Sequence, residues 1–183
     1  MSLLDEQPVV LITGISAAGK STVADLLAHR FERGVHVKGD VFRRMVVGGR
    51  QEMSSAPTEE AWRQLRLRYR LGASTADSYH EAGFSVVVQD VVIGSVLIEY
   101  AQAICSRPLV VVVLTPSPEV VARREASRSK IAYRGDFDTI VELDAALRRE
   151  TPRVGLWLDT SDHGPEQTVD EIVDRGLDEG GLI

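Results

Sequence analysis

The chain has 183 residues, of which 44% are hydrophobic and 26% are charged, and its formal net charge is −6. These values are those of a globular protein, and the negative charge argues against a general nucleic-acid binder, which would carry a basic surplus. The single cysteine, Cys105, excludes an internal disulfide framework, and its place near the end of an apolar helical segment predicts a buried structural thiol. Because no apolar run is long enough to span a membrane, we expect a cytoplasmic protein.

The amino-terminal region combines a buried strand, a glycine turn and a helix. Residues 9–12 form an apolar run, and residues 21–33 carry apolar side chains at helical spacing. Between them, residues 14–21 read GISAAGKS, which fits the phosphate-binding pattern of glycine, four residues, glycine, lysine and serine. We therefore predict a nucleoside triphosphate site, in which Lys20 reaches the β- and γ-phosphates and Ser21 joins the shell of Mg²⁺. The alternative is an ordinary strand-to-helix turn that contains glycines.

The remaining segments alternate between strand-like and helix-like patterns, which predicts a doubly wound parallel sheet. Strands are expected at residues 35–38, 84–89, 109–114 and 155–158. Helices are expected at residues 41–47, 58–82, 96–105, 119–127, 138–149 and 165–174, the last of them capped by Gly176. The aliphatic run at 109–114 is typical of a central parallel strand.

Two aspartates directly follow predicted strands. In open parallel sheets, ligands bind beyond the carboxyl ends of the strands, where the phosphate loop, Asp40 and Asp90 would lie. Asp40 could orient an attacking hydroxyl and accept its proton, or it could cap the helix that starts at Val41. Asp90 could hold Mg²⁺ directly or through water, or it could serve as a cap or bind the phosphate-loop backbone.

A basic cluster precedes and enters the polar segment of residues 128–153. Its members are Arg123, Arg124, Arg128, Lys130 and Arg134. Arg124 and Arg128 lie one helical turn apart, and arginines that close over the site from a lid would stabilise the charge on a transferred phosphoryl group. A solvated helix face paired with Glu125 is the alternative, and spacing alone does not say which arginine would reach the phosphate.

Three segments carry a resemblance to a known family: residues 13–22 (TGISAAGKST), 39–49 (GDVFRRMVVGG) and 122–128 (ARREASR). Through them the chain resembles the small P-loop kinases, in particular bacterial gluconate-kinase-like proteins and chloramphenicol phosphotransferases. The resemblance implies a three-layer α/β P-loop fold with a five-stranded parallel sheet of strand order 2-3-1-4-5 and helices on both faces. It further implies one domain over residues 1–183, acceptor-binding helices at about 41–82 and a helical lid at about 127–153.

The resemblance also implies ATP and Mg²⁺ as the source of the phosphoryl group. Asp40 matches the base for the acceptor hydroxyl, Arg124 and Arg128 match lid arginines that act with Lys20, and Ser21 and Asp90 are the metal candidates. The expected nucleotide contacts are Gly14, Ser16, Ala17, Ala18, Gly19, Lys20, Ser21, Thr22, Arg123, Thr160 and Ser161. The lid lacks the four cysteines of zinc-bearing relatives, so no structural metal is expected.

The leading interpretation is a kinase that transfers the γ-phosphoryl group of ATP to a hydroxyl of a small molecule, such as a sugar acid, a nucleoside-like compound or an antibiotic. It would act as a monomer or homodimer, without nucleic-acid or membrane partners. One alternative is a nucleotide-binding switch or regulatory ATPase, although the sequence has no Asn-Lys-x-Asp motif for guanine. The other is a polynucleotide 5′-kinase, which the stripe of Arg63, Arg66 and Arg70 keeps open.

Overall fold

The protein is described here by a computed structural model, which covers residues 2–54, 56–127 and 136–182. Its centre is a parallel sheet of five strands, and the strand order is 2-3-1-4-5, as predicted. In that order the strands are β2 (Gly34–Lys38), β3 (Ser85–Gln89), β1 (Val9–Thr13), β4 (Leu109–Leu114) and β5 (Leu156–Leu158). The three central strands are buried along their whole length, because their aliphatic side chains are covered by helices on both faces.

A short sixth strand joins the sheet, which the sequence pattern did not predict. In β6 (Gly181–Leu182) the chain runs antiparallel to β4, with Leu182 opposite Leu109. A strand of two residues shows no alternation of apolar and polar side chains, so it leaves no pattern in the sequence.

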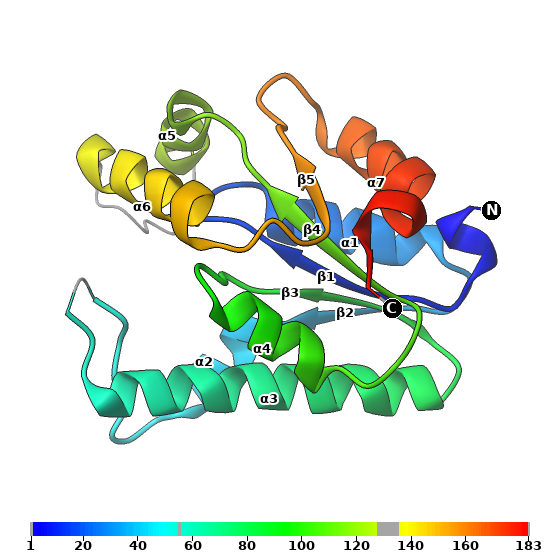
Figure 1. Ribbon diagram of the computed structural model, residues 1–183, viewed down its shortest axis with the longest axis horizontal. Helices are drawn as coiled ribbons and strands as arrows, with labels where there is room; N and C mark the ends of the chain where they lie inside the picture. The colour runs from blue at the N-terminus through cyan, green and yellow to red at the C-terminus, as the bar shows by residue number, and fades with distance from the viewer. Residues whose placement is uncertain (1, 55, 128–135, 183) are drawn as a thin grey trace.

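Seven helices surround the sheet in the described residues. They are α1 (Lys20–Arg30), α2 (Gly39–Met45), α3 (Glu59–Glu81), α4 (Val96–Ala103), α5 (Pro118–Ala126), α6 (Phe137–Glu150) and α7 (Pro165–Gly180). Figure 1 shows α1 and α7 on one face and α3 and α4 on the other, which makes three layers. The paired helices α5 and α6 lie beyond the carboxyl ends of the central strands, on the side where the phosphate loop follows β1.

Several helix ends follow from their capping residues. Ser117 caps α5 by accepting a hydrogen bond from the backbone N–H of Val120, and Pro118 is the first helical residue. Thr58 caps α3 in the same way, and Gly83 follows the end of this helix with a φ of 85°. That left-handed conformation suits glycine, so the long helix ends where the sequence placed it.

Two predictions about the helices are wrong. Gly176 does not cap α7, which continues to Gly180; instead it is buried, and a Cβ atom there would lie 3.4 Å from Val110. This glycine therefore lies inside α7, next to β4, and does not end the helix. Cys105 is exposed and not buried, because α4 ends at Ala103 and the chain turns before it. Within the described residues, we find no helix with the length and apolar character that a membrane span requires.

Candidate functional site: a phosphate loop and its surroundings

The phosphate loop connects β1 to α1 through a turn that most side chains would not fit. Gly14, Ala17 and Gly19 have φ angles of 146°, 60° and 99°. A Cβ atom at Gly14 would lie 2.6 Å from the carbonyl oxygen of Leu114, so this position requires glycine both for its conformation and for its space. Among the described residues no side chain caps the N-terminus of α1, and the N-terminus of a helix carries a partial positive charge. This geometry suits a polyphosphate.

Lys20 places its ammonium group inside the loop. The residue is buried, and its Nζ donates a hydrogen bond of 2.7 Å to the carbonyl oxygen of Ile15. The ammonium group of Lys20 thus lies against the backbone of the loop. Ser21 and Thr22 are both exposed, and Thr22 also lines the cavity described below.

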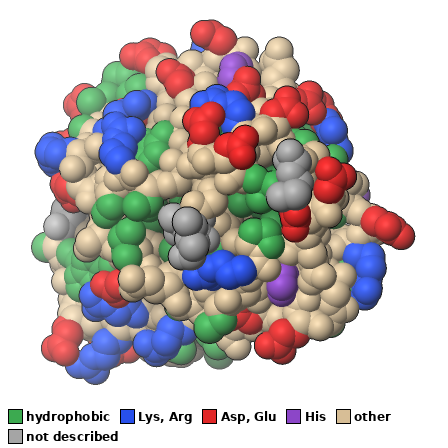
Figure 2. Space-filling model, turned by 45° about the vertical axis from the view of Figure 1, so that its right-hand side comes forward, with side chains coloured by type: hydrophobic (Ala, Val, Ile, Leu, Met, Phe, Trp, Pro, Cys, Tyr) green, Lys and Arg blue, Asp and Glu red, His purple; other side chains and the backbone are tan. Residues whose placement is uncertain are grey.

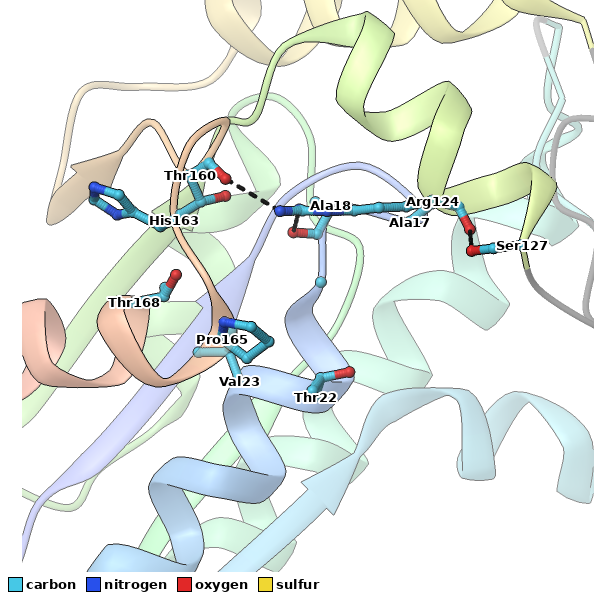
Figure 3. Close-up of a pocket in the computed structure, with 11 residues that line it drawn as sticks. Ala17, Ala18, Thr22, Val23, Arg124, Ser127, Thr160, His163, Pro165 and Thr168 are labelled. Carbon is cyan, nitrogen blue, oxygen red and sulfur yellow. Dashed lines mark hydrogen bonds between the residues drawn. The ribbon is translucent and has the colours of Figure 1, made fainter.

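Arg124, on α5, joins two loops that are distant in sequence. Its guanidinium donates to the carbonyl oxygen of Ala18 in the phosphate loop and to that of Thr160 after β5, both at 3.1 Å (Figure 3). Both partners are neutral, and no carboxylate of the described residues pairs with this cation. Burial, followed by the neighbouring charge of Arg123, lowers the pKa of Arg124. A bound anion would relieve this unfavourable environment.

Beside this arginine lies a cavity of about 230 Å³, between α1, α5 and the loop that leads into α7 (Figure 3). Residues from the phosphate loop and from distant segments line it: Ala17, Ala18, Gly19, Thr22, Val23, Arg124, Ser127, Thr160, His163, Pro165 and Thr168. The buried hydroxyl of Thr160 and the Nδ1 atom of His163 have no hydrogen-bond partner among the described residues. A cavity with unused polar atoms next to a phosphate loop is suited to the base and ribose of a nucleotide.

The structure brings only some of the expected nucleotide contacts to this cavity. Thr160 lines it, but the Ser161 hydroxyl accepts a hydrogen bond from the backbone N–H of Ser117 instead. Arg123 is exposed on α5 and does not line the cavity. Arg128, Lys130 and Arg134, the other members of the basic cluster, lie outside the described residues.

Asp40 lies in the first turn of α2, at the carboxyl end of β2. The capping role considered for it is wrong, because α2 begins one residue earlier, at Gly39, and Lys38 occupies the N-cap position. Its carboxylate accepts a hydrogen bond of 2.9 Å from Nε of Arg43 and lies 3.3 Å from Nε of Arg44. Arg43 also binds the carboxylate of Glu52 at 2.7 and 2.8 Å, so it connects α2 to the loop that precedes α3.

Asp90 follows β3 and is almost fully buried. The Arg68 guanidinium on α3 binds both of its carboxylate oxygens, one of them through Nε at 2.8 Å. Burial raises the pKa of the Asp90 carboxyl, and the charge of Arg68 opposes that shift. Burial acts to lower the pKa of Arg68, but Asp90 overcomes this effect and leaves it raised. The two charges are therefore each other's main electrostatic partner.

The sequence reasoning missed Arg68 as a site residue. Its position was a usable signal, since Arg68 occupies the apolar face of α3 between Leu65 and Tyr69, at helical spacing. A cation on the apolar face of a helix needs a buried partner, and the carboxyl end of the nearest strand supplies one.

Of the two residues predicted to bind Mg²⁺, only Ser21 is in a position that suits a metal ligand. The exposed Ser21 hydroxyl at the first turn of α1 suits a metal bound to a nucleotide, whereas both oxygens of Asp90 are occupied by Arg68. In the described part of the chain, no group of three or more His, Cys, Asp or Glu side chains is arranged to hold a metal by itself.

The sequence profile of the AAA domain family matches residues 9–152, and the chain belongs to this family. A search of curated proteins found no match to the chain.

Solved structures with the same fold include several kinases. A sugar kinase from Janibacter sp. is 21% identical with a TM-score of 0.67, over 95% of this chain and 96% of that one. The APS kinase of Mycobacterium tuberculosis, in complex with AMPPNP and APS, is 18% identical with a TM-score of 0.69, over 91% and 95%. A gluconokinase from Sinorhizobium meliloti is 15% identical with a TM-score of 0.63, over 92% and 90%. These likenesses establish a P-loop kinase fold.

Proposed function

We propose that the protein is an ATP-dependent kinase that transfers the γ-phosphoryl group to a hydroxyl of a small molecule. The observation that carries the proposal is the anion cradle after β1, where loop amides and Lys20 meet Arg124, a cation without a carboxylate partner in the described residues. Three sources of positive potential around one loop favour a ligand with several negative charges.

Each residue has a proposed task in the transfer. Mg²⁺, held with the nucleotide at Ser21, would neutralise phosphate charge. Lys20 and Arg124 stabilise the charge on the γ-phosphate oxygens, and Asp40 accepts the proton of the acceptor hydroxyl. The acceptor oxygen forms a bond to the γ-phosphorus as the bond from that phosphorus to the bridging oxygen breaks, which leaves ADP and a phosphate monoester.

Two observations favour a small acceptor over a polynucleotide. Arg63 is paired with Glu59 and Glu60, and Arg66 with Glu99, so two arginines of the α3 stripe are already neutralised. Figure 2 shows basic and acidic side chains interspersed on one face of the molecule rather than a continuous basic area. A sugar kinase, a gluconokinase and an APS kinase among proteins of the same fold support a small hydroxylated acceptor.

The test begins with calorimetry of Mg·ATP binding, followed by a screen for ADP release against hydroxylated metabolites and antibiotics. Turnover that rises with one acceptor class supports the kinase, while slow hydrolysis that no compound enhances supports a switch or regulatory ATPase. The absence of any heat on titration with Mg·ATP would overturn the proposal altogether.

The role of Asp40 is tested with a matched pair of variants, because Asp40 and Glu52 both bind Arg43. Asp40→Asn should lower turnover about 10²- to 10⁴-fold without changing ATP affinity, since it removes the base. Glu52→Gln removes a carboxylate from the same arginine and should leave turnover close to that of the wild type. Unchanged turnover in Asp40→Asn would remove Asp40 from the mechanism.

A further inference from the structure

The carboxylate of Asp90 is enclosed by groups of the protein itself. Arg68 binds both of its oxygens, and the backbone N–H of Val91 donates to Oδ1 at 2.7 Å. The Asp90 side chain is 3% exposed and that of Arg68 is 14% exposed. A metal ligand of this type needs a lone pair that faces the ion, and the bidentate guanidinium takes the positions that Mg²⁺ would need.

The turn between β2 and α2 lies against the same carboxylate. A Cβ atom built at Gly39 would overlap the carboxylate of Asp90, so the absence of a side chain at Gly39 is what lets the two meet. Asp40, the proposed base, is the next residue in the chain. The position of the Asp90 carboxylate therefore constrains the backbone from which the Asp40 side chain projects.

The helix α3 approaches the same strand end through two consecutive side chains. Arg68 binds Asp90, and the Tyr69 hydroxyl donates a hydrogen bond of 2.9 Å to the carbonyl oxygen of Val91. The Tyr69 ring in turn stacks on Tyr100 of α4, with ring centroids 4.7 Å apart. This part of α3 is thus fixed to the carboxyl end of β3 by a buried network of polar and aromatic contacts.

We infer that Asp90 is a positioning residue: it clamps α3, through Arg68, and the start of α2, through Gly39, to the carboxyl end of β3, and it does not coordinate the nucleotide-bound metal. The clamp sets where Asp40 stands relative to the phosphate loop. The electrostatic environment agrees with this arrangement, because Arg68 interacts with the charges of both Asp90 and Asp40. The inference rests on the proposed nucleotide site only for its statement about the metal.

The metal is tested by titrating Mn²⁺, in place of Mg²⁺, into the protein saturated with AMPPNP and following free Mn²⁺ by electron paramagnetic resonance. Asp90→Asn should bind Mn²⁺ as tightly as the wild type. If Asp90 were a ligand, the same variant should lose about tenfold or more in Mn²⁺ affinity. That loss would overturn the inference.

The clamp is tested by hydrogen exchange of the backbone amides in α2. Arg68→Gln and Asp90→Asn should each accelerate exchange in Gly39–Met45 by about tenfold, because each opens the same contact. Arg66→Gln is the matched control: it removes an arginine two residues away on α3 whose pair with Glu99 is exposed, and it should leave α2 unchanged. Equal exchange in α2 for all three variants would overturn the clamp.

A fourth variant covers the case in which a single substitution does not fold, because Arg68→Gln and Asp90→Asn each leave a buried charge without its partner. The double variant Asp90→Asn/Arg68→Gln removes both charges, and it should show wild-type Mn²⁺ affinity together with accelerated exchange in α2. A tenfold loss of Mn²⁺ affinity in this protein would again identify Asp90 as a ligand. If the wild type does not bind AMPPNP, the proposed function fails, while the exchange experiment still decides the clamp.

Discussion

On the proposed nucleotide side, the phosphate loop is shaped by backbone conformation and by contact with β4, whereas on the proposed acceptor side α2 and α3 are held by ion pairs between side chains. Gly14 lies against the Leu114 carbonyl and Lys20 donates to Ile15 within the loop. In contrast, Arg43 donates hydrogen bonds to the carboxylates of both Asp40 and Glu52.

The two sides should therefore respond differently to amino-acid substitution. A site made of backbone groups tolerates only those substitutions that allow the same backbone conformation. Its expected ligand is the polyphosphate group, which all nucleoside triphosphates share. Exposed ion pairs such as that of Arg43 with Glu52 can change at little cost to the fold, whereas the buried pair of Arg68 and Asp90 cannot. Variation in the acceptor would therefore arise on α2 and α3, while the nucleotide side stays constant.

The sharpest test of the nucleotide side is Lys20→Met. We expect a loss of about 10²- to 10³-fold in phosphoryl transfer, because a preorganised charge next to the γ-phosphate is removed. The thermal midpoint should change little, since methionine can occupy the buried space of the lysine stem. Transfer at the wild-type rate, measured as ADP release with the acceptor found in the screen, would contradict the role of the phosphate loop.

The next effect in size is that of Arg124→Gln. Loss of a charged group that joins Ala18 to Thr160 should weaken ATP binding by about 10- to 100-fold, measured by calorimetry. Arg123→Gln is the control, because the adjacent side chain is exposed and does not line the cavity. An equal loss of ATP affinity in both variants would mean that ATP binding depends on the net charge of α5 and not on the specific contacts of Arg124.

On the acceptor side, Gly39→Ala should destabilise the protein by about 1–3 kcal/mol, because the new methyl group overlaps Asp90. Chemical denaturation measures this loss. Gly48→Ala is a suitable comparison, since a Cβ atom there meets nothing within 4 Å among the described residues, and its stability should be unchanged. Equal stability of the two variants would contradict the close contact between Gly39, at the start of α2, and Asp90, at the end of β3.

The smallest effect is expected for Arg63→Gln on the outer face of α3. Its pairs with Glu59 and Glu60 are exposed, so the free energy of unfolding should fall by no more than about 1 kcal/mol. Salt should reduce the difference between variant and wild type further. A loss larger than that of Gly39→Ala would reverse the ranking of exposed and buried contacts on which the comparison depends.

The sequence patterns were sufficient for the buried strands and for the phosphate loop, whereas the strand order 2-3-1-4-5 was implied by the resemblance to the small P-loop kinases. Aliphatic runs such as 109–114 mark buried parallel strands, and the glycines of residues 14–19 mark a turn that few other residues allow. Both are local patterns. Gly176 shows where a local rule fails, because this glycine lies inside α7 and does not end the helix.

The sequence indicates that Arg68 needs a buried partner, but it does not identify Asp90 as that partner. The position of Asp90 after a strand is a local feature, but Arg68 lies 22 residues earlier, and only the packing of α3 on the sheet brings the two together. The same holds for Arg124, whose spacing from Arg128 said nothing of the carbonyl oxygens of Ala18 and Thr160. Charge pairs between residues that are distant in sequence depend on how the helices and strands pack. Such pairs leave no periodic pattern in a single sequence.

The two-residue strand β6 has a consequence for handling the protein. β5 covers β4 only from Val112 to Leu114, and β6 pairs with the opposite end, at Leu109 and Val110. Deletion of Gly181 and Leu182 would uncover backbone N–H and C=O groups along an aliphatic strand, where another molecule could pair with them. A truncated protein should therefore self-associate at concentrations where the intact chain remains dispersed, a difference that light scattering would reveal.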